Sequence, residues 1–276
     1  ASMSMLSKLQ KFGGGNEDDD HCLYINREGF ARLVDKDRPA LELGPFGNPT
    51  LRGPNVKYFD VLNKAGLTAK AHEYGMDENY QRNIPYIHFV ERSGDLGAVV
   101  VATNETFYSL FSSHNIEHYT DLIGHLNAAH RILAYNGRYY LIVPDKRYCF
   151  DHFFEETRVS QIVAAHFEQP SRRTHSLETV LKNCDITHND PGKHWRGDHG
   201  DPDRKYENAE CLWKTLEMYR AANGTYFDVH NWRFTPNSFR RVIETLYSMR
   251  LIKFRVERIY CTRKNEFSFE VILYKP

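Results

Sequence analysis

Two acidic residues and a pair of glycines early in the chain have the spacing of a ligand-binding turn. A short apolar run contains Glu42, a turn with Gly44 and Gly47 follows it, and a second apolar run, 56–60, ends in Asp60. Glycines let the backbone approach a ligand without a Cβ clash, and an acid after the second strand can bind both hydroxyls of a ribose. The pattern predicts a site for an adenosine-bearing cofactor. The simpler interpretation is that the glycines only form a turn and Asp60 only caps a helix.

Two details of this turn favour S-adenosylmethionine over a dinucleotide. The turn lacks the third glycine that usually accompanies a pyrophosphate. Glu42 stands at the end of the first strand, where it can face the ammonium group of the cofactor through the backbone or a water molecule.

A second group of motifs lies further along the chain. The strand-like run 107–111 leads into Ser-Ser-His-Asn-Ile-Glu-His at 112–118, and a helical pattern at 121–133 comes next. An Asn-Gly turn at 136–137 then precedes Arg-Tyr-Tyr-Leu-Ile-Val-Pro at 138–144. This order closely resembles the second half of class I S-adenosylmethionine-dependent methyltransferases of the small-molecule type. In that family a segment like S-x-x-I-E-H follows the fourth strand, and one like G-R-x-x-x-x-V-P forms the fifth.

The resemblance covers roughly residues 33–143 and resumes from 234 to the C-terminus. It implies an α/β fold with a Rossmann-like, seven-stranded, mostly parallel sheet, and S-adenosylmethionine as the cofactor. Open α/β sheets bind ligands beyond the carboxyl ends of their strands. The predicted cofactor-binding residues follow the first four strands and are Glu42, Gly44, Asp60, Asp95, Leu96, Ser113 and His114. Among them, Asp95 and Leu96 match the positions that meet the adenine in the resembled family.

The Glu117-His118 pair within the second group has two interpretations. In the resembled enzymes such a pair occurs whatever the substrate, which suggests a structural or cofactor-shaping role. The alternative is a role in acid–base chemistry. His114 lies closer to the strand end, where the donor methyl group should emerge, and is the better candidate for contact with the reacting groups.

The chain reads as one methyltransferase domain, 21–276, preceded by a glycine- and acid-rich mobile tail, 1–20. Within the domain, residues 145–233 separate the fifth strand from the next family-like element. We expect this segment to be an inserted helical cap over the substrate. Its helical patterns lie near 157–167, 177–182 and 206–221.

A polar loop at 187–202 is the least generic part of the insertion. It holds His188, Asp190, His194, Trp195, Asp198, His199 and Asp201. Carboxylates and imidazoles can hydrogen-bond to hydroxyls, and Trp195 or Trp232 can stack on a sugar ring, so substrate recognition is one interpretation. A metal site and a solvated loop are the others. The His and Asp spacing fits no familiar ligand frame, so we expect no bound metal.

Methyl transfer to a hydroxyl oxygen needs a base to remove the proton. The candidate bases are His114, His188, His194 and His230, with Asp145 as a carboxylate alternative. The Val-Pro-Asp-Lys-Arg-Tyr and His-Asn-Asp-Pro segments resemble those of methyltransferases associated with bacterial surface-glycan assembly. The expected reaction is methyl transfer to an oxygen, or less favourably a nitrogen, of a small polar acceptor, and the resemblance favours the hydroxyl of a sugar. The alternative function is a non-catalytic methyltransferase-like module that binds a glycan or a partner protein.

The composition narrows the partners and the location. Acidic and basic residues number 36 each, so no net charge attracts nucleic acid, and no N-P-P-Y-type motif is present. The five cysteines are widely spaced without a C-x-x-C pair and indicate reduced thiols. No apolar run is long enough to span a membrane. We expect a cytoplasmic protein that meets a small-molecule or glycan acceptor and, by the resemblance, glycan-assembly enzymes.

The C-terminal part predicts the close of the sheet. A helical pattern at 237–249 follows Thr235, a preferred N-cap residue, and Pro236, which suits the first helical position. Two β-like runs follow, 252–260 and 267–274, separated by a polar turn. We expect them to form an antiparallel pair, with the last strand at or near the sheet edge.

Overall fold

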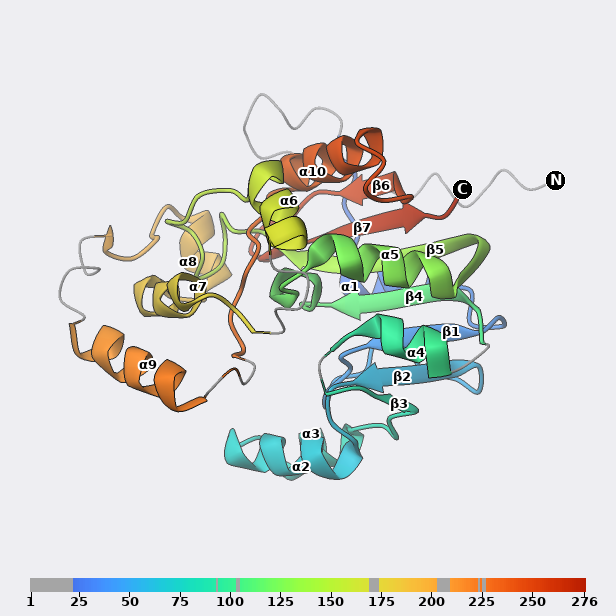
Figure 1. Ribbon diagram of the computed structural model, residues 1–276, viewed down its shortest axis with the longest axis horizontal. Coiled ribbons are helices and arrows are strands. Elements are labelled where there is room, and N and C mark those ends of the chain that lie inside the picture. The colour runs from blue at the N-terminus through green and yellow to red at the C-terminus, as the bar shows by residue number, and fades with distance from the viewer. Residues whose placement is uncertain are drawn as a thin grey trace.

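The computed structural model describes residues 22–92, 94–102, 105–168, 174–202, 209–222, 224 and 227–276. The predicted mobile tail therefore lies outside the described residues. Seven strands form one sheet in the order β3-β2-β1-β4-β5-β7-β6 (Figure 1). The strands are β1 (Ala40–Leu43), β2 (Val56–Asp60), β3 (Phe89–Val90), β4 (Phe107–Ser113), β5 (Leu133–Pro144), β6 (Arg255–Tyr260) and β7 (Ser268–Tyr274).

The pairing of the strands confirms the predicted fold class. Strand β1 pairs in parallel with β2 and β4, and β3 and β5 extend the parallel set on either side. Strand β7 is antiparallel to both β5 and β6. The C-terminal antiparallel pair is thus confirmed, with β7 one position inside the sheet and β6 at its edge.

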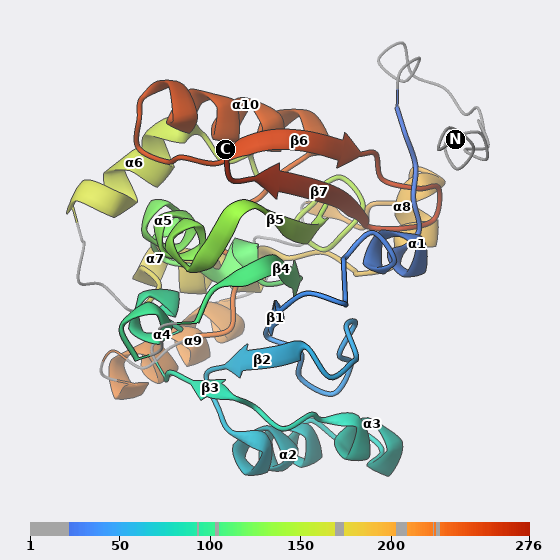
Figure 2. The same ribbon diagram turned by 90° about the vertical axis from the view of Figure 1, so that its right-hand side faces the viewer.

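Helices cover both faces of this sheet (Figure 2). One face carries α4 (Leu96–Ala102), α5 (Leu122–Ile132), α6 (Val159–Glu168) and α10 (Pro236–Ser248). The other carries α1 (Arg27–Ala31) and α2 (Lys64–Glu73), with α3 (Glu78–Asn83) beside α2. None of the described helices combines the length and the hydropathy that crossing a membrane requires.

Local sequence explains where two of these helices begin. The side chain of Asp121 accepts the backbone N–H of Gly124 and caps α5, whose apolar side is buried against the sheet. Thr235 and Ser238 form a capping box at the start of α10, and Pro236 occupies its first turn. The predicted cap of this helix is confirmed, because the orphan N–H groups of the first turn find side-chain acceptors there.

The insertion is helical, as predicted. Besides α6 it contains α7 (Leu177–Leu181), the 3₁₀ turn η2 (Lys182–Asp185), α8 (Pro191–Trp195) and α9 (Ala209–Ala222). Figure 1 shows α7, α8 and α9 on the side of the sheet toward which β4 points. The short helix α8 was not predicted: Asp190 caps it by accepting the N–H of Lys193. Residues 206–208 of the predicted third helix lie outside the described residues.

Four of the five cysteines form disulfides, so the prediction of reduced thiols is wrong for them. Cys22 pairs with Cys261, and Cys184 with Cys211, while Cys149 is free and buried. Residues 239 positions apart in the first pair meet only in the folded chain, where their Cα atoms lie 5.7 Å apart. Sequence spacing cannot reveal such a pair. Because disulfides persist mainly in oxidising compartments, the cysteines no longer support a cytoplasmic location.

Candidate active site

The turn after β1 is built around a buried carboxylate. Glu42 is 2% exposed, and its two oxygens accept the backbone N–H groups of Thr50 and Leu51, each at 2.8 Å. Burial raises the pKa of Glu42 to about 7. Both oxygens thus hold the loop against the sheet. A contact of Glu42 with the ammonium group of the cofactor stays a prediction.

The two glycines of this turn have different reasons to be glycine. Gly44 adopts φ +65°, and a Cβ there would lie 3.0 Å from the side-chain nitrogen of Asn115. At Gly47 a Cβ would meet the ring of Tyr80 at 2.3 Å. At Gly44, where the chain leaves the sheet, both the left-handed φ and the nearby Asn115 disfavour a side chain. Gly47 instead leaves room for the ring of Tyr80 from α3.

Asp60 ends β2 beside the same turn. It is buried, and its carboxylate accepts the N–H of Val61 at 2.7 Å. Burial raises the pKa of Asp60 to about 6, and backbone N–H groups, including that of Phe46, oppose the rise. The backbone N–H of Phe46 is close enough to affect this carboxylate, so Asp60 lies beside the glycine turn. A contact of Asp60 with a ribose stays a prediction.

Of the two residues predicted to contact the adenine, Asp95 has an exposed side chain and Leu96 a buried one. Asp95 is exposed, and its carboxylate accepts the N–H of Gly97 at 2.8 Å, at the start of α4. The side chain of Leu96 is buried in the main hydrophobic core. Any contact of Leu96 with the adenine would therefore involve its backbone.

At the end of β4, Arg27 links two predicted cofactor loops, although no sequence motif indicated this residue. Arg27 of α1 donates to the hydroxyl of Ser113 at 2.8 Å and to that of Thr50 at 2.6 Å. The next residue, His114, has φ +50°, and its Nε2 lies 3.0 Å from the hydroxyl of Ser268. Burial and the positive charge of Arg27 lower the pKa of His114 to about 3, so this imidazole is neutral at physiological pH.

Immediately beyond His114, a buried carboxylate lies among three imidazoles. Glu117 is 1% exposed and belongs to the 3₁₀ turn η1 (Ile116–His118). Its Oε1 lies 3.7 Å from Nε2 of both His118 and His230, and 3.9 Å from Nδ1 of His114. Neither oxygen accepts a hydrogen bond from any other residue that the structure describes. Burial raises the pKa of Glu117 to about 7.

Two of these imidazoles also have a second carboxylate near their Nδ1 atom. Nδ1 of His230 lies 2.5 Å from Asp151, which also binds the guanidinium of Arg233 at 2.8 Å. Nδ1 of His118 lies 3.3 Å from Asp228. Burial alone would lower the pKa of His230, but the bond to Asp151 and the charge of Glu117 outweigh it and raise that pKa. The sequence motif flagged the Glu-His pair, but nothing in it pointed to Asp151.

His188 and His194 belong to a second group of histidines in the insertion, together with His152 and His199. Nδ1 of His194 lies 3.0 Å from Nδ1 of His199, and its Nε2 lies 3.0 Å from the carbonyl oxygen of His188. The rings of His152 and His199 stack with centroids 3.7 Å apart. Of the candidate bases, the structure therefore places His114 and His230 together and His188 and His194 in another cluster.

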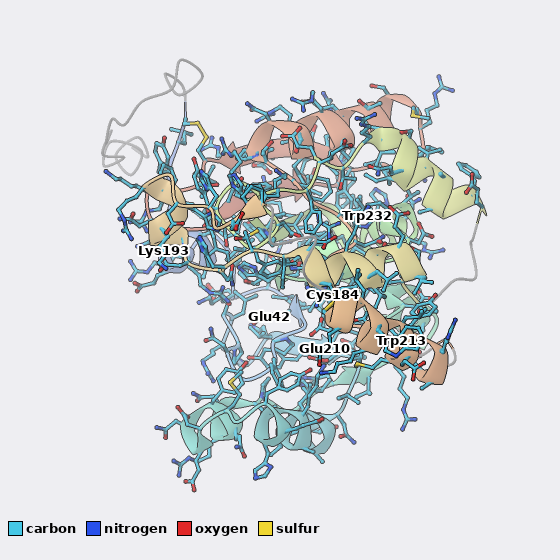
Figure 3. All side chains as sticks on the ribbon, turned by 90° about the vertical axis from the view of Figure 1, so that its left-hand side faces the viewer. Glu42, Cys184, Lys193, Glu210, Trp213 and Trp232 are labelled. Carbon is cyan, nitrogen blue, oxygen red and sulfur yellow. A yellow bond between two sulfur atoms is a disulfide. The ribbon has the colours of Figure 1, made fainter. Side chains whose placement is uncertain are left out.

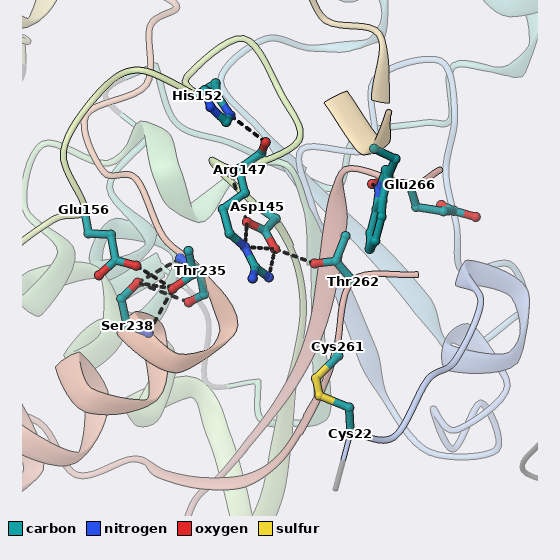
Figure 4. Close-up of polar contacts among 11 residues, drawn as sticks. Cys22, Asp145, Arg147, His152, Glu156, Thr235, Ser238, Cys261, Thr262 and Glu266 are labelled. Atoms are coloured by element: carbon teal, nitrogen blue, oxygen red, sulfur yellow. Dashed lines mark hydrogen bonds and ion pairs between the residues drawn. A yellow bond between two sulfur atoms is a disulfide. The ribbon is translucent and has the colours of Figure 1, made fainter. Parts of the chain in front are cut away.

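Asp145, the carboxylate alternative, is fully buried and engaged in structure. Arg147 binds its two oxygens through Nε and Nη2, and the hydroxyl of Thr262 donates to it at 2.6 Å (Figure 4). These bonds tie the start of the insertion to the chain after β6. With its oxygens engaged in this way, Asp145 is poorly placed to accept a proton from an acceptor.

The two tryptophans considered for ring stacking also have structural partners. Trp195 stacks on Tyr148 with ring centroids 4.1 Å apart, and it donates to the carbonyl oxygen of Glu266 at 2.8 Å. Trp232 is buried in the main core and donates to the carbonyl oxygen of Tyr119 at 2.7 Å. One face of Trp195 is thus occupied, and Trp232 anchors the end of the insertion.

A cavity of about 610 Å³ lies within the insertion, and among the residues that the structure describes Thr120 is its one lining residue from outside 145–233. Its lining includes Thr120, Phe154, His175, Thr179, Asn231 and Trp232. The backbone N–H of Asn231 donates to the carbonyl oxygen of Glu117 at 2.8 Å, so one wall of the cavity continues into the Glu117 cluster. Figure 3 shows Trp232 and Glu42 on the side of the molecule that the insertion covers.

No protein-family model and no curated protein matches the chain. Among solved structures, an S-adenosylmethionine-dependent methyltransferase from Mesorhizobium loti aligns over 89% of this chain and 95% of its own, with 10% identity and a TM-score of 0.43. The CcbJ methyltransferase from Streptomyces caelestis aligns over 91% and 94%, with 8% identity and a TM-score of 0.42. The glycopeptide N-methyltransferase MtfA, complexed with sinefungin, aligns over 44% and 56%, with 16% identity and a TM-score of 0.30. Values this low support no inference about activity.

Proposed function

We propose that this protein transfers a methyl group from S-adenosylmethionine to a hydroxyl oxygen of a small polar acceptor. The observation that carries the proposal is the cluster of His114, Glu117, His118 and His230 at the carboxyl end of β4. It adjoins the loops where a Rossmann-like sheet binds its ligand. A buried carboxylate among partly exposed imidazoles has the chemistry to activate a hydroxyl there.

The residues proposed to hold the cofactor come from three loops. Asp60 would accept hydrogen bonds from the ribose, Gly44 would allow close approach, and the Asp95-Leu96 segment would meet the adenine. Arg27 would bind the carboxylate of the cofactor, because its hydrogen bonds to Ser113 and Thr50 hold the guanidinium between the loops after β4 and β1. When bound, S-adenosylmethionine supplies an electrophilic methyl group on a sulfonium.

The acceptor oxygen has to approach that methyl group in line with the bond to sulfur, and most of the catalytic effect comes from this alignment. The bound cofactor would supply the methyl carbon as the electrophile, and its sulfur would be the leaving group that keeps the electron pair. The hydroxyl proton must leave the oxygen, and the Glu117 cluster is the group proposed to promote its departure.

We infer that the cavity within the insertion admits the acceptor. Hydroxyl, amide and imidazole groups of Thr120, Thr179, Asn231 and His175 line it, which suits a molecule rich in hydroxyls. A sugar hydroxyl, with glycan-assembly enzymes as partners, is the specific form of this proposal. It rests on the resemblance of the Val-Pro-Asp-Lys-Arg-Tyr segment.

Calorimetry with S-adenosylhomocysteine tests the cofactor, and a methyl-transfer screen against nucleotide sugars and lipid-linked glycans tests the acceptor. Saturable binding of S-adenosylhomocysteine together with transfer to one acceptor class supports the enzyme. Absence of binding by the folded chain would favour the alternative, a methyltransferase-like module that binds a glycan or partner without turnover.

A further inference from the structure

The donor atoms around Glu117 have the arrangement of an unassembled metal site. One ligand atom each from Glu117, His118 and His230 lies within 4.8 Å of the others, and His114 approaches the same carboxylate oxygen at 3.9 Å. Ligands bound to a metal at about 2.0–2.1 Å stand roughly 3 Å apart. The two 3.7 Å separations from Glu117 would have to shrink by roughly 0.7 Å, and the widest separation, at most 4.8 Å, by up to roughly 1.8 Å. We propose that Glu117, His118 and His230 bind a divalent transition-metal ion, with His114 as a fourth ligand.

The first support is the orientation of the imidazoles. Nδ1 of His230 hydrogen-bonds to Asp151, and Nδ1 of His118 lies 3.3 Å from Asp228 without forming a hydrogen bond, while the Nε2 atom of each ring lies toward Glu117. Metal-binding histidines almost always give their other ring nitrogen to a carboxylate or carbonyl, which fixes the tautomer and the ring plane. In His114 the roles are reversed: Ser268 meets Nε2, and Nδ1 faces Glu117.

The second support is the state of the carboxylate. A hydrogen bond needs a separation of about 2.7–3.2 Å, so the 3.7 Å contacts to His118 and His230 are too long to count as hydrogen bonds. A buried carboxylate that accepts no hydrogen bond from another described residue, and whose nearest possible cations are imidazoles 3.7 Å away, is costly. A bound cation would remove that cost.

The donor set also indicates the class of cation. Three imidazoles and one carboxylate suit Zn²⁺, Fe²⁺ or Co²⁺, whereas Mg²⁺ and Ca²⁺ prefer oxygen ligands throughout. The prediction of no bound metal rested only on the spacing of the His and Asp residues within 188–201. The site proposed here takes its ligands from two segments that only the fold brings together.

A role for this ion rests on the proposed function. An open coordination position would receive the acceptor hydroxyl and lower its pKa, so the proton would leave to solvent and the oxygen would attack as the stronger nucleophile.

Metal binding is tested on the full chain, stripped with a chelator and titrated with Co²⁺ and Zn²⁺ in the absence of cofactor. We expect one equivalent to bind, with a visible Co²⁺ spectrum characteristic of nitrogen ligands. Glu117→Gln and His118→Ala should each raise the Kd at least tenfold. His199→Ala is the matched control, because His152, His194 and His199 form a second group of donors within 4.8 Å; it should change the Kd less than twofold.

Three outcomes overturn the proposal. The stripped wild type binds neither ion, or His199→Ala abolishes binding while the Glu117 and His118 variants keep it, or all variants bind equally. If the two ligand variants fail to fold by circular dichroism, Asp228→Asn replaces them. That exposed residue only orients His118, and its loss should weaken binding about tenfold or more. Binding of S-adenosylhomocysteine is measured separately, so a failed metal site leaves the proposed methyltransferase standing.

Discussion

Glu42 after β1 and Glu117 after β4 are two buried glutamates with opposite surroundings. Both side chains are almost completely shielded from solvent, and burial raises the pKa of each to about 7. The oxygens of Glu42 accept two backbone N–H groups at 2.8 Å, whereas those of Glu117 accept a hydrogen bond from no other residue that the structure describes. Burial alone therefore does not separate a structural acid from a functional one. We propose that the absence of hydrogen-bond donors among the described residues marks Glu117 as the functional acid of the two.

The largest effect expected from this contrast is on turnover. Glu117→Gln should lower the kcat for the acceptor found in the screen at least 100-fold, the order of magnitude of a lost activating group. The free energy of unfolding should stay the same or rise, because the variant removes a buried charge that has no hydrogen bond. Methyl-transfer assays and urea unfolding measure the two quantities. If the variant is less stable but fully active, Glu117 contributes to the stability of the fold and not to turnover.

The next effect concerns the acid at the end of β2. Asp60→Ala should weaken the binding of S-adenosylmethionine by roughly 2–3 kcal/mol, since charge-assisted bonds to both ribose hydroxyls would be lost. Asp190→Ala is a suitable control, because Asp190 also caps a local turn but belongs to the insertion. Calorimetry on both variants checks this. Unchanged affinity in a folded Asp60 variant would place the ribose elsewhere.

The sequence predicted the sheet well because each strand carries its own signal. The apolar runs that end in Asp60 and Pro144, and the Thr235-Pro236 start of α10, depend on neighbouring residues alone. Local propensity, capping and proline geometry are enough to define such elements.

The site was predicted only in part, because its decisive contacts join distant segments. The Glu-His pair at 117–118 was visible as a motif, but its partners His230 and Asp151 lie far along the chain. For the same reason, local sequence did not predict the role of Arg27, which precedes the first strand, or the Cys22–Cys261 disulfide. Conversely, Asp145 looked catalytic by its position after β5, and only its bonds to Arg147 and Thr262 reveal a structural role.

A smaller effect should follow when Glu42 is changed. In Glu42→Gln one carboxylate oxygen becomes an NH₂ group, which faces the N–H of either Thr50 or Leu51 and leaves that donor unpaired. We expect a loss of about 1–3 kcal/mol in the free energy of unfolding, with metal binding at Glu117 unchanged. Denaturant unfolding and the Co²⁺ titration test both parts. Loss of the metal in this variant would mean that the two glutamates are not independent.

The smallest effect is the dependence of stability on pH that Glu42 contributes. Its pKa rises from 4.5 to about 7 on folding, so between these values the folded state holds more protons than the unfolded state. The contribution of Glu42 is therefore most favourable below pH 4.5 and is lost as the pH rises through 7, with a slope of at most about 1.4 kcal/mol per pH unit. Asp60 and Glu270, whose pKa values burial also raises, add slopes of the same sign.

The informative quantity is therefore the difference in stability between wild type and Glu42→Gln, measured by urea unfolding at pH 5 and pH 7.5. We expect the variant to lose less stability than the wild type across this interval. Equal losses would mean that Glu42 stays ionised throughout, held by the N–H groups of Thr50 and Leu51.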